Sequence, residues 1–264
     1  MDFINLLQQN SAVFYSLIIF ISLAFGSFLN VVIYRLPRMM EQEWHSQCRE
    51  LLELPANKPE KISLAFPASA CPQCGHKIRF WENIPVFSYI FLKGQCSGCG
   101  NKISLQYPLI EAVTAILSVA VAWKFGVSWQ TPLALLLTWS LIALTMIDFH
   151  KQLLPDSITL PLLWLGLLAN IFEIFTTLES AVIGAMAGYL ALWCVYHTFK
   201  LLTGKEGMGF GDFKLLGALG AWLGWKILPL IILLSSLVGA VIGIALIVLT
   251  RHDKNIPIPF GPYL

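Results

Sequence analysis

Seven apolar stretches dominate this chain of 264 residues, and most come close to the roughly 20 residues that an α-helix needs to cross a bilayer. Hydrophobic residues make up 57% of the sequence and charged residues only 12%, whereas soluble domains carry roughly 25% charged residues. We therefore predict an all-α polytopic membrane protein with about seven transmembrane helices, over residues 11–34, 105–122, 131–147, 153–175, 181–199, 213–225 and 227–250.

The first apolar stretch has the features of a membrane anchor rather than of a removable signal peptide. No basic region precedes it, no small-residue cleavage site follows it, and Arg35 and Arg38 come directly after it. We expect residues 1–34 to form the first transmembrane anchor.

Basic residues predict the orientation, because cytoplasmic loops retain an excess of Lys and Arg. With the N-terminus on the outer, periplasmic side, all but two of the 17 Lys and Arg residues lie inside, the exceptions being Lys124 and Lys226. This places the long polar insertion, residues 35–104, in the cytoplasm. The basic residues then serve as topology signals, so the net charge of +2 gives no indication of nucleic-acid binding.

The polar insertion begins with the spacing of an amphipathic helix over residues 38–54 and then contains a short repeat, CPQCGHKI followed by CSGCGNKI. Each copy holds a CxxC pair, and a glycine follows each pair. A CxxC turn directs two thiolates at one metal, and the glycine permits a positive φ where the chain turns. The repeat predicts a tetrahedral zinc site with four ligands, Cys71, Cys74, Cys96 and Cys99.

Two disulfides or a redox pair are the alternatives to zinc, and a reducing cytoplasm disfavours both. A four-cysteine zinc site has no open position for a substrate, so we expect its role to be structural. It would hold together a loop that is too small to build its own core. Cys48 and Cys194 lie outside the repeat, and we expect them to be buried apolar residues.

Three aspartates lie at the ends of apolar stretches, where ionisable residues are costly and suggest function. Asp148 and Asp156 bound the short turn DFHKQLLPD, and Asp212 ends the segment GMGFGD. The orientation above puts all three at the cytoplasmic boundary of the membrane. Peptide hydrolysis by carboxylates needs two of them close enough to share one proton, so this group contains a candidate catalytic pair.

Asp212 is preceded by three glycines that would let a substrate backbone approach closely, Gly207, Gly209 and Gly211. The alternative is that Asp212 only caps a helix. Asp156 follows Pro155 at a predicted helix start, where capping is the more frequent role. The residue chemistry alone leaves Asp148 and Asp156 in competition for the second position of the pair.

Five segments in order resemble the prepilin peptidases, also called type IV leader peptidases, a family of GxGD-type membrane aspartic proteases. They are GSFLNVVIYRLP, the two cysteine motifs, DFHKQLLPD with TLPLLWLGLL, GMGFGDFKLLGALGAWLG, and FGPYL at 260–264. The resemblance implies that Asp148 and Asp212 are the catalytic pair, and that Asp156 belongs to the active-site loop.

The resemblance also implies substrates and a second activity. The substrates would be precursors of type IV pilins and of the pilin-like subunits of type II secretion, each with a short basic leader before an apolar helix. Cleavage would follow a glycine at the cytoplasmic boundary of the bacterial inner membrane. Many family members also methylate the new N-terminus with S-adenosylmethionine, and the cysteine-bearing loop accompanies the bifunctional members. No sequence pattern here marks a methyl-donor site.

In the family an eighth apolar span usually follows the FGP motif, whereas this sequence ends at Leu264. We expect residues 105–264 to form a six-helix membrane peptidase core that is truncated at its C-terminus. Two other functions stay open: a proton-coupled transporter, since carboxylates in membranes also relay protons, and an assembly protein that binds pilin precursors without cutting them. No duplicated halves of the kind typical of transporters occur in the sequence.

Overall fold

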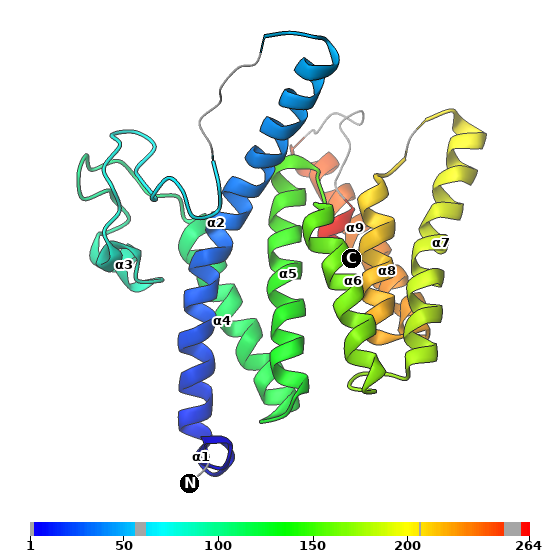
Figure 1. The fold of residues 1–264 in the computed structure, drawn as a ribbon, viewed down its shortest axis with the longest axis horizontal. Coiled ribbons are helices and arrows are strands. Elements are labelled where there is room, and N and C mark those ends of the chain that lie inside the picture. Colours follow the sequence, from blue (N-terminus) through cyan, green and yellow to red (C-terminus); the bar gives the residue numbers. More distant parts are fainter. Residues whose placement is uncertain (1–2, 56–61, 206, 251–259) are drawn as a thin grey trace. The chain divides into compact units, whose positions relative to one another are not determined.

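The computed structural model describes residues 3–55, 62–205, 207–250 and 260–264, which fold into two compact units, Met1–Ala143 and Leu144–Leu264. The described residues are helical, and their only β contacts are two isolated bridges in the loop between α2 and α4. Figure 1 shows the elements of each unit. An all-helical structure is expected for apolar sequence in a bilayer, because an α-helix satisfies all of its backbone hydrogen bonds within one segment.

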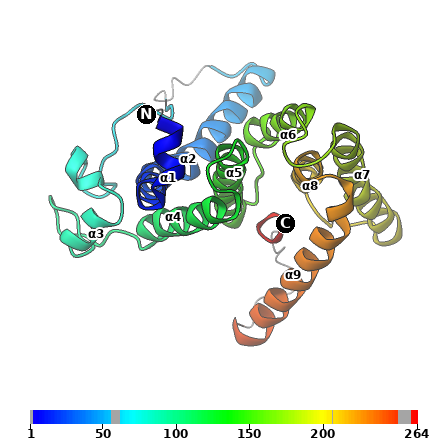
Figure 2. The same cartoon turned by 90° about the horizontal axis from the view of Figure 1, so that it is seen from below.

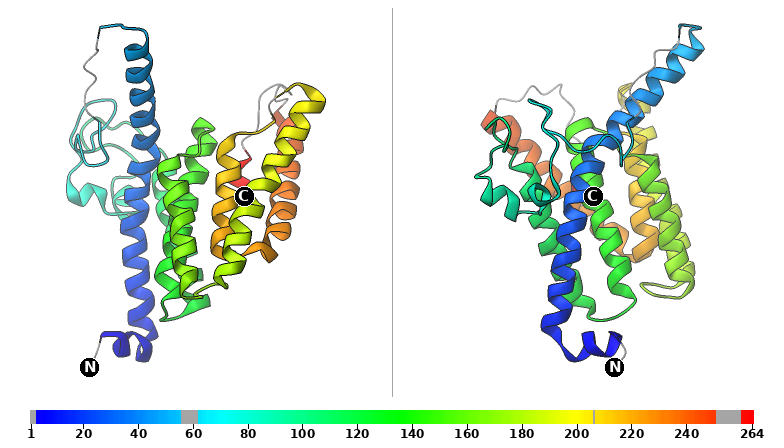
Figure 3. Two further views of the ribbon diagram at one scale, coloured as in Figure 1. Left: turned by 45° about the vertical axis from the view of Figure 1, so that its right-hand side comes forward. Right: turned by 60° about the vertical axis from the view of Figure 1, so that its left-hand side comes forward.

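Unit 1 contains the short helix α1 (Phe3–Gln9), the long helix α2 (Ser11–Leu51), the loop with η1 (Phe80–Asn83) and α3 (Phe87–Phe91), α4 (Gln106–Phe125) and the first part of α5 (Gln130–Lys151). The predicted helix over residues 38–54 is the continuation of the first span, because α2 passes through Pro37 and ends at Leu51 (Figure 3).

Helices α2 and α4 pack closely at Gly26. A methyl group at this position would lie 2.8 Å from Cα of Glu111, so only glycine permits this approach. The Asn30 amide adds polar contacts by donating to the Tyr107 carbonyl at 3.2 Å and to the Gly26 carbonyl at 3.3 Å. Hydrogen bonds of this kind stabilise helix pairs within a membrane.

Unit 2 contains the end of α5, then α6 (Asp156–Ile171), α7 (Leu178–Thr203), α8 (Phe210–Leu223), η2 (Trp225–Ile227), α9 (Leu228–Thr250) and η3 (Gly261–Tyr263). Helix α8 lies beside α6 and α7 (Figure 2) and is almost entirely buried. A helix that is hydrophobic on all sides is stable only when neighbours surround it.

Small residues and two polar side chains fix α8 against its neighbours. Gly188 on α7 packs on the α8 backbone, where a methyl group would lie 2.6 Å from the Leu216 carbonyl. On the α6 side, the Trp222 indole donates to the Leu162 carbonyl at 2.8 Å, and the Asn170 amide donates to the Ala221 carbonyl at 2.8 Å. These contacts hold α8, which carries Asp212, in one position within the unit.

Helices form in all seven apolar stretches, which confirms the predicted fold class. Among the described residues, five helices are long and apolar enough to cross a membrane, whereas α6 and α8 have only 16 and 14 residues. At 1.5 Å per residue these two are about 24 Å and 21 Å long, less than the roughly 30 Å of a bilayer core. The sequence pattern overestimated α6 because it included the apolar residues of the turns at both ends.

The two cysteines outside the repeat contradict the prediction that they are buried. Cys48 and Cys194 are both exposed in the structure. Cys194 lies on α7, a candidate membrane span, where apolar residues on the outer face meet lipid rather than a protein core. Cys48 lies on the part of α2 beyond the predicted membrane segment, and its helix face is uncovered.

Candidate active site and metal centre

Asp148 and Asp212 come together within unit 2. Asp148 is in the last turn of α5 and 5% exposed, and Asp212 is in the first turn of α8 and 6% exposed. The two carboxylates are close enough for their charges to interact. Oδ2 of Asp148 is buried and has no hydrogen-bond partner in the described part of the chain, which is unusual for a carboxylate oxygen.

Gly261, from the FGPYL segment, packs directly against this pair. Its backbone N–H donates to the Asp148 carboxylate, and a methyl group at this position would lie 2.6 Å from Oδ2 of Asp148. Leu154 lies between Gly261 and Gly211, since a methyl group at Gly211 would approach its Cβ to 2.6 Å. The segments that contain Gly261, Leu154 and Gly211 therefore pack together beside the carboxylates. The first and the third require glycine at these positions.

The three glycines before Asp212 have different environments. A methyl group at Gly207 would lie 2.8 Å from the Phe199 ring, so this glycine and Gly211 are needed for packing. Around Gly209 the nearest atom to such a methyl group is Oδ2 of Asp212, at 3.9 Å. Among the three, only Gly209 would accept a methyl group without displacing a described neighbour.

Asp212 is not the N-cap of α8. Gly209 occupies that position, and Asp212 is the third helical residue. A methyl group at Gly209 would lie 3.9 Å from Oδ2 of Asp212, so the carboxylate lies beside the start of its own helix. Asp212 therefore does not take the N-cap position that the capping alternative gave it.

Asp156 does not cap its helix, which corrects the prediction made from its position. Pro155 is the N-cap of α6, so Asp156 is the first helical residue and its side chain is free to turn away. Both of its carboxylate oxygens accept hydrogen bonds from Nζ of Lys214, each at 2.7 Å. The charge of Asp156 is thus balanced by Lys214.

The four repeat cysteines cluster in the loop of unit 1, and their Sγ atoms all lie within 4.8 Å of one another. The Sγ atoms of Cys71 and Cys99 are 3.9 Å apart, and those of Cys74 and Cys96 are 4.0 Å apart. A tetrahedral zinc site with bonds of about 2.3 Å places its sulfurs about 3.8 Å apart. All four cysteines are free thiols, so the cluster does not contain the disulfides of the alternative interpretation.

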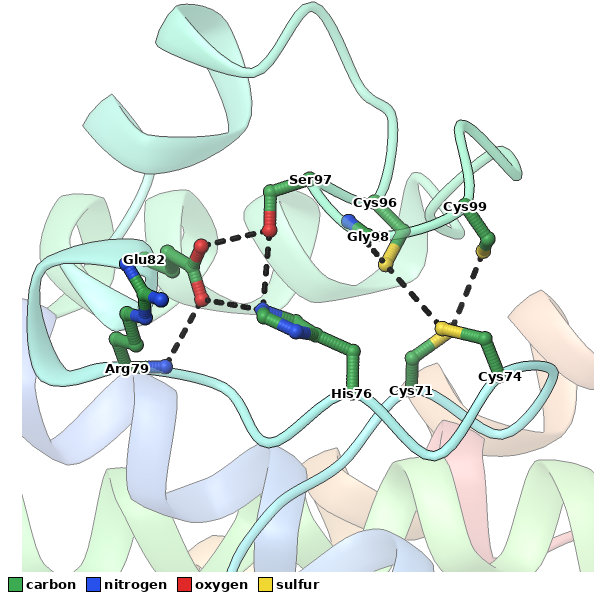
Figure 4. Close-up of polar contacts among 9 residues, drawn as sticks. All are labelled: Cys71, Cys74, His76, Arg79, Glu82, Cys96, Ser97, Gly98 and Cys99. Carbon is green, nitrogen blue, oxygen red and sulfur yellow. Dashed lines mark hydrogen bonds and ion pairs between the residues drawn. The ribbon is translucent and has the colours of Figure 1, made fainter.

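Both copies of the repeat adopt the same turn. Gly75 and Gly100 have φ of 70° and 74°, as predicted. The backbone N–H of each first cysteine donates across the turn, from Cys71 to the His76 carbonyl at 2.9 Å and from Cys96 to the Asn101 carbonyl at 2.8 Å. The sequence repeat is therefore a structural repeat of two knuckles that face each other (Figure 4).

The thiols of the cluster differ in acidity. Backbone N–H groups of Cys74 and Gln73 lower the pKa of the Cys71 thiol to about 6. The N–H of Asn101 also lowers the pKa of the Cys99 thiol, but contacts with the sulfurs of the other three cysteines raise it to about 12. Four thiolates at this separation repel one another, and a bound divalent cation would offset that repulsion. These residues fit a zinc ion.

A second set of polar contacts joins the two knuckles beside the sulfurs (Figure 4). The Glu82 carboxylate accepts from the Ser97 hydroxyl at 2.6 Å and from the Arg79 backbone N–H at 2.9 Å, and it contacts the His76 ring at 3.2 Å. The Arg79 N–H is the main cause that lowers the pKa of Glu82 to about 2. Glu82 therefore stays ionised and holds residues of both knuckles.

Several of these residues were given no role in the sequence interpretation. Gly261 was recorded only as part of the FGPYL segment, and Leu154 only as part of the aspartate turn. Their positions inside motifs were the available signal, but the packing of Gly261 against Asp148 and Leu154 joins segments more than 100 residues apart. Glu82 lies between the two cysteine pairs without any motif of its own.

Two family models match this chain. The Bacterial Peptidase A24 N-terminal domain matches residues 20–125, and the Type IV leader peptidase family matches residues 135–244. The first range contains the four cysteines, and the second contains Asp148 and Asp212. No solved structure matches the chain significantly.

Curated relatives match over nearly the whole length. The Prepilin leader peptidase/N-methyltransferase of Stutzerimonas stutzeri is 56% identical over 99% of this chain and 91% of its own length. The proteins of the same name from Pseudomonas aeruginosa and Aeromonas salmonicida are 55% and 58% identical, over 100% and 95% of this chain and 91% and 87% of their own lengths. This chain belongs to the type IV leader peptidase family. The resemblance deduced from the five segments is confirmed.

The metal centre and the carboxylate site rest on different kinds of observation. The cysteine cluster has a geometry that can be compared directly with a known metal site. The carboxylate site is a pair of buried acids in the region that the peptidase model matches. Its residue roles form part of the function proposed below.

Proposed function

We propose that this chain is a membrane aspartic endopeptidase that removes the leader from type IV prepilins and type II secretion pseudopilins, with Asp148 and Asp212 as its catalytic pair. The observation that carries the proposal is that these two buried carboxylates lie close enough for their charges to interact, and one of them has an oxygen without a partner among the described residues. The names of relatives that are more than 50% identical support the substrate class.

The pair would work by sharing one proton. The ionised carboxylate removes a proton from water as the water oxygen attacks the scissile carbonyl carbon, while the protonated carboxyl donates its proton to the carbonyl oxygen. The tetrahedral intermediate then collapses and the C–N bond breaks. The nitrogen of the leaving amine takes up the proton held by the carboxylate that activated the water, while a hydroxyl of the intermediate returns its proton to the other carboxylate and restores the pair. Gly209 is the glycine before Asp212 that no described neighbour crowds, and it would allow a substrate backbone to approach the pair.

The topology that suits this substrate places both aspartates at the cytoplasmic face of the bacterial inner membrane, with the N-terminus in the periplasm. A prepilin helix in the membrane would present its basic leader to the cytoplasm by the same rule that orients this chain. The lipid bilayer is then a partner of both enzyme and substrate, and the cut falls beside the substrate helix rather than within it.

The second proposed activity is N-methylation of the newly exposed N-terminus with S-adenosylmethionine as methyl donor. The name of the relatives, which includes N-methyltransferase, supports this activity. The zinc site would support the methyltransferase only as a scaffold, because its four protein ligands leave no open position on the metal.

Both activities can be tested in one assay. Purified protein in phospholipid vesicles is incubated with a type IV prepilin, with and without S-adenosylmethionine, and the product is analysed by mass spectrometry. We expect a product without the leader, and one additional methyl group when the donor is present. The peptidase proposal fails if wild type and Asp212→Ala give the same result, and the methyltransferase proposal fails if the donor adds no mass.

A further inference from the structure

The loop between the two cysteine pairs carries an exposed apolar segment, residues 80–92, with the sequence FWENIPVFSYIFL. Arg79 and Lys93 flank it, and Glu82 is its only charged residue. Four of its large side chains are 55–82% exposed: Phe80, Phe87, Ile90 and Phe91. A cluster of exposed aromatic and aliphatic side chains of this kind is unusual on a surface that faces water.

Two hydrogen bonds fix the middle of this segment against the membrane helices of unit 1. The Val86 backbone N–H donates to Oε2 of Glu111 on α4 at 2.8 Å. The Ser27 hydroxyl on α2 donates to Oδ1 of Asn83 at 3.4 Å. One contact is made to α4 and the other to α2, so each fixes the position of the segment relative to a different helix.

Both contacts lie on the apolar side of the polar boundary. Glu111 is five residues into α4, which begins at Gln106, so it lies about 7 Å along that helix at 1.5 Å per residue. On α2 the boundary is marked by Arg35, whose guanidinium binds the carbonyls of Ser63 and Pro67 at 3.0 Å and 2.7 Å. Ser27 precedes Arg35 by eight residues, or about 12 Å.

We propose that the apolar segment enters the membrane leaflet on the side of the metal centre and packs its exposed side chains against lipid acyl chains. Its depth suits a lipid surface, since residues 83–86 lie roughly 7–12 Å below the polar boundary. Amphipathic segments at membrane surfaces bury their apolar face to a similar depth of about 5–10 Å. Trp81 and the flanking Arg79 and Lys93 match the residues that favour the interface.

The single charge of the segment is consistent with this placement. Glu82 makes its contacts with Arg79, Ser97 and His76 beside the cysteine knuckles, and its side chain is only 11% exposed. At the start of α4, its N-cap Leu105 and Leu109 are also exposed, by 71% and 60%. The knuckles thus join the two ends of a segment whose other face meets lipid.

Photo-crosslinking from the exposed side chains tests this placement. The full chain carries p-benzoylphenylalanine in place of Phe91 and is reconstituted in vesicles of phosphatidylethanolamine and phosphatidylglycerol. Two equally exposed positions on α2 serve as references: Phe20, 74% exposed within the membrane span, and Leu51, 84% exposed and about 24 Å beyond Arg35. After irradiation, mass spectrometry measures the yield of lipid adducts, and zinc content is measured to verify the fold.

We expect lipid adducts from position 91 at a yield similar to that from position 20 and at least tenfold above that from position 51. A yield at position 91 no higher than at position 51 would overturn the proposal. Adducts to a second protein molecule in place of lipid would also overturn it, and would indicate a protein-binding surface. The same substitution at Phe87 provides a second position should the variant at 91 fail to bind zinc.

Discussion

The metal centre and the carboxylate site are assembled from the sequence in different ways. The four cysteines come from two copies of one eight-residue motif, and all of their spacing lies within residues 71–99. The carboxylate site gathers Asp148 from the end of α5, Leu154 from the turn after it, Asp212 from the start of α8 and Gly261 from η3. The first site depends on local turns and a metal, whereas the second depends on how α5, α6, α8 and the C-terminal segment pack.

This difference predicts that damage to one site leaves the other intact. Loss of a zinc ligand should unfold the loop of unit 1 without moving the aspartates. A steric change at the carboxylate site should stop cleavage without releasing zinc. The predictions below test this separation, beginning with the largest expected effect.

Replacing Cys71 with serine leaves three thiolates, which cannot complete a tetrahedral zinc site. We expect the zinc content measured by elemental analysis to fall from about one per chain to below about 0.1, because the metal and the fold of such a loop depend on each other. Hydrogen exchange should accelerate in residues 71–104 and remain unchanged around Asp148 and Asp212.

Cys48→Ser is the control for this prediction, since Cys48 is an exposed thiol outside the cluster. It should retain full zinc content and normal exchange. The four-cysteine site would be contradicted if wild-type protein contained no zinc, or if Cys71→Ser retained about one zinc per chain.

Replacing Gly261 with alanine places a methyl group 2.6 Å from Oδ2 of Asp148 and forces the carboxylate to move. Displacement of a catalytic group by about 1 Å can cost about a hundredfold in rate, so we expect kcat for prepilin cleavage to fall roughly 100-fold with zinc content unchanged.

Gly209→Ala is the matched variant for the Gly261 prediction, because no atom lies within 3.9 Å of the added methyl group and φ at this position is −85°. It should keep the melting temperature and raise KM more than it lowers kcat, as expected of a site that contacts only substrate. Wild-type kcat in Gly261→Ala would contradict the role of the C-terminal segment.

Replacing Glu82 with glutamine removes the ionised acceptor that joins the two knuckles while keeping its shape. Groups that orient metal ligands typically change metal affinity by about 10- to 100-fold, and we expect zinc transfer to a chelator to become about tenfold faster. Glu50→Gln, at the exposed end of α2, serves as control. Equal transfer rates for Glu82→Gln and wild type would show that the contacts of Glu82 do not support the metal.

Replacing Asp156 with asparagine should have the smallest effect. Its ion pair with Lys214 is partly exposed, and such pairs contribute about 0–1 kcal/mol. We expect cleavage within about threefold of wild type, and the same for Lys214→Gln. A loss of more than about 100-fold in Asp156→Asn would restore Asp156 as a candidate for the catalytic pair.

The sequence predicted the fold class, all seven helical stretches and the cysteine cluster, because these depend on local patterns. Apolar length predicts helices in a bilayer, and a CxxC motif with a following glycine predicts its own turn. Helix ends were less accurate: α2 continues through Pro37 to Leu51, and α6 ends at Ile171 because the apolar residues that follow form a turn.

The carboxylate site could be predicted only in part. The glycines before Asp212 indicated a close approach, but the sequence could not distinguish a glycine that packs on Phe199 or Leu154 from one that no described neighbour crowds. The choice between Asp148 and Asp156 came from family resemblance. The ion pair of Asp156 with Lys214 joins positions 58 residues apart, and no local pattern specifies it.

The central claim is that Asp148 and Asp212 act as one catalytic pair. Cleavage rates of Asp148→Asn and Asp212→Asn, measured on a prepilin in phospholipid vesicles with zinc content as the control for folding, test it most directly. The account predicts that each variant keeps its zinc and loses at least about 1000-fold in rate, since each removes one half of a shared-proton pair. Cleavage by either variant within tenfold of wild type would contradict it.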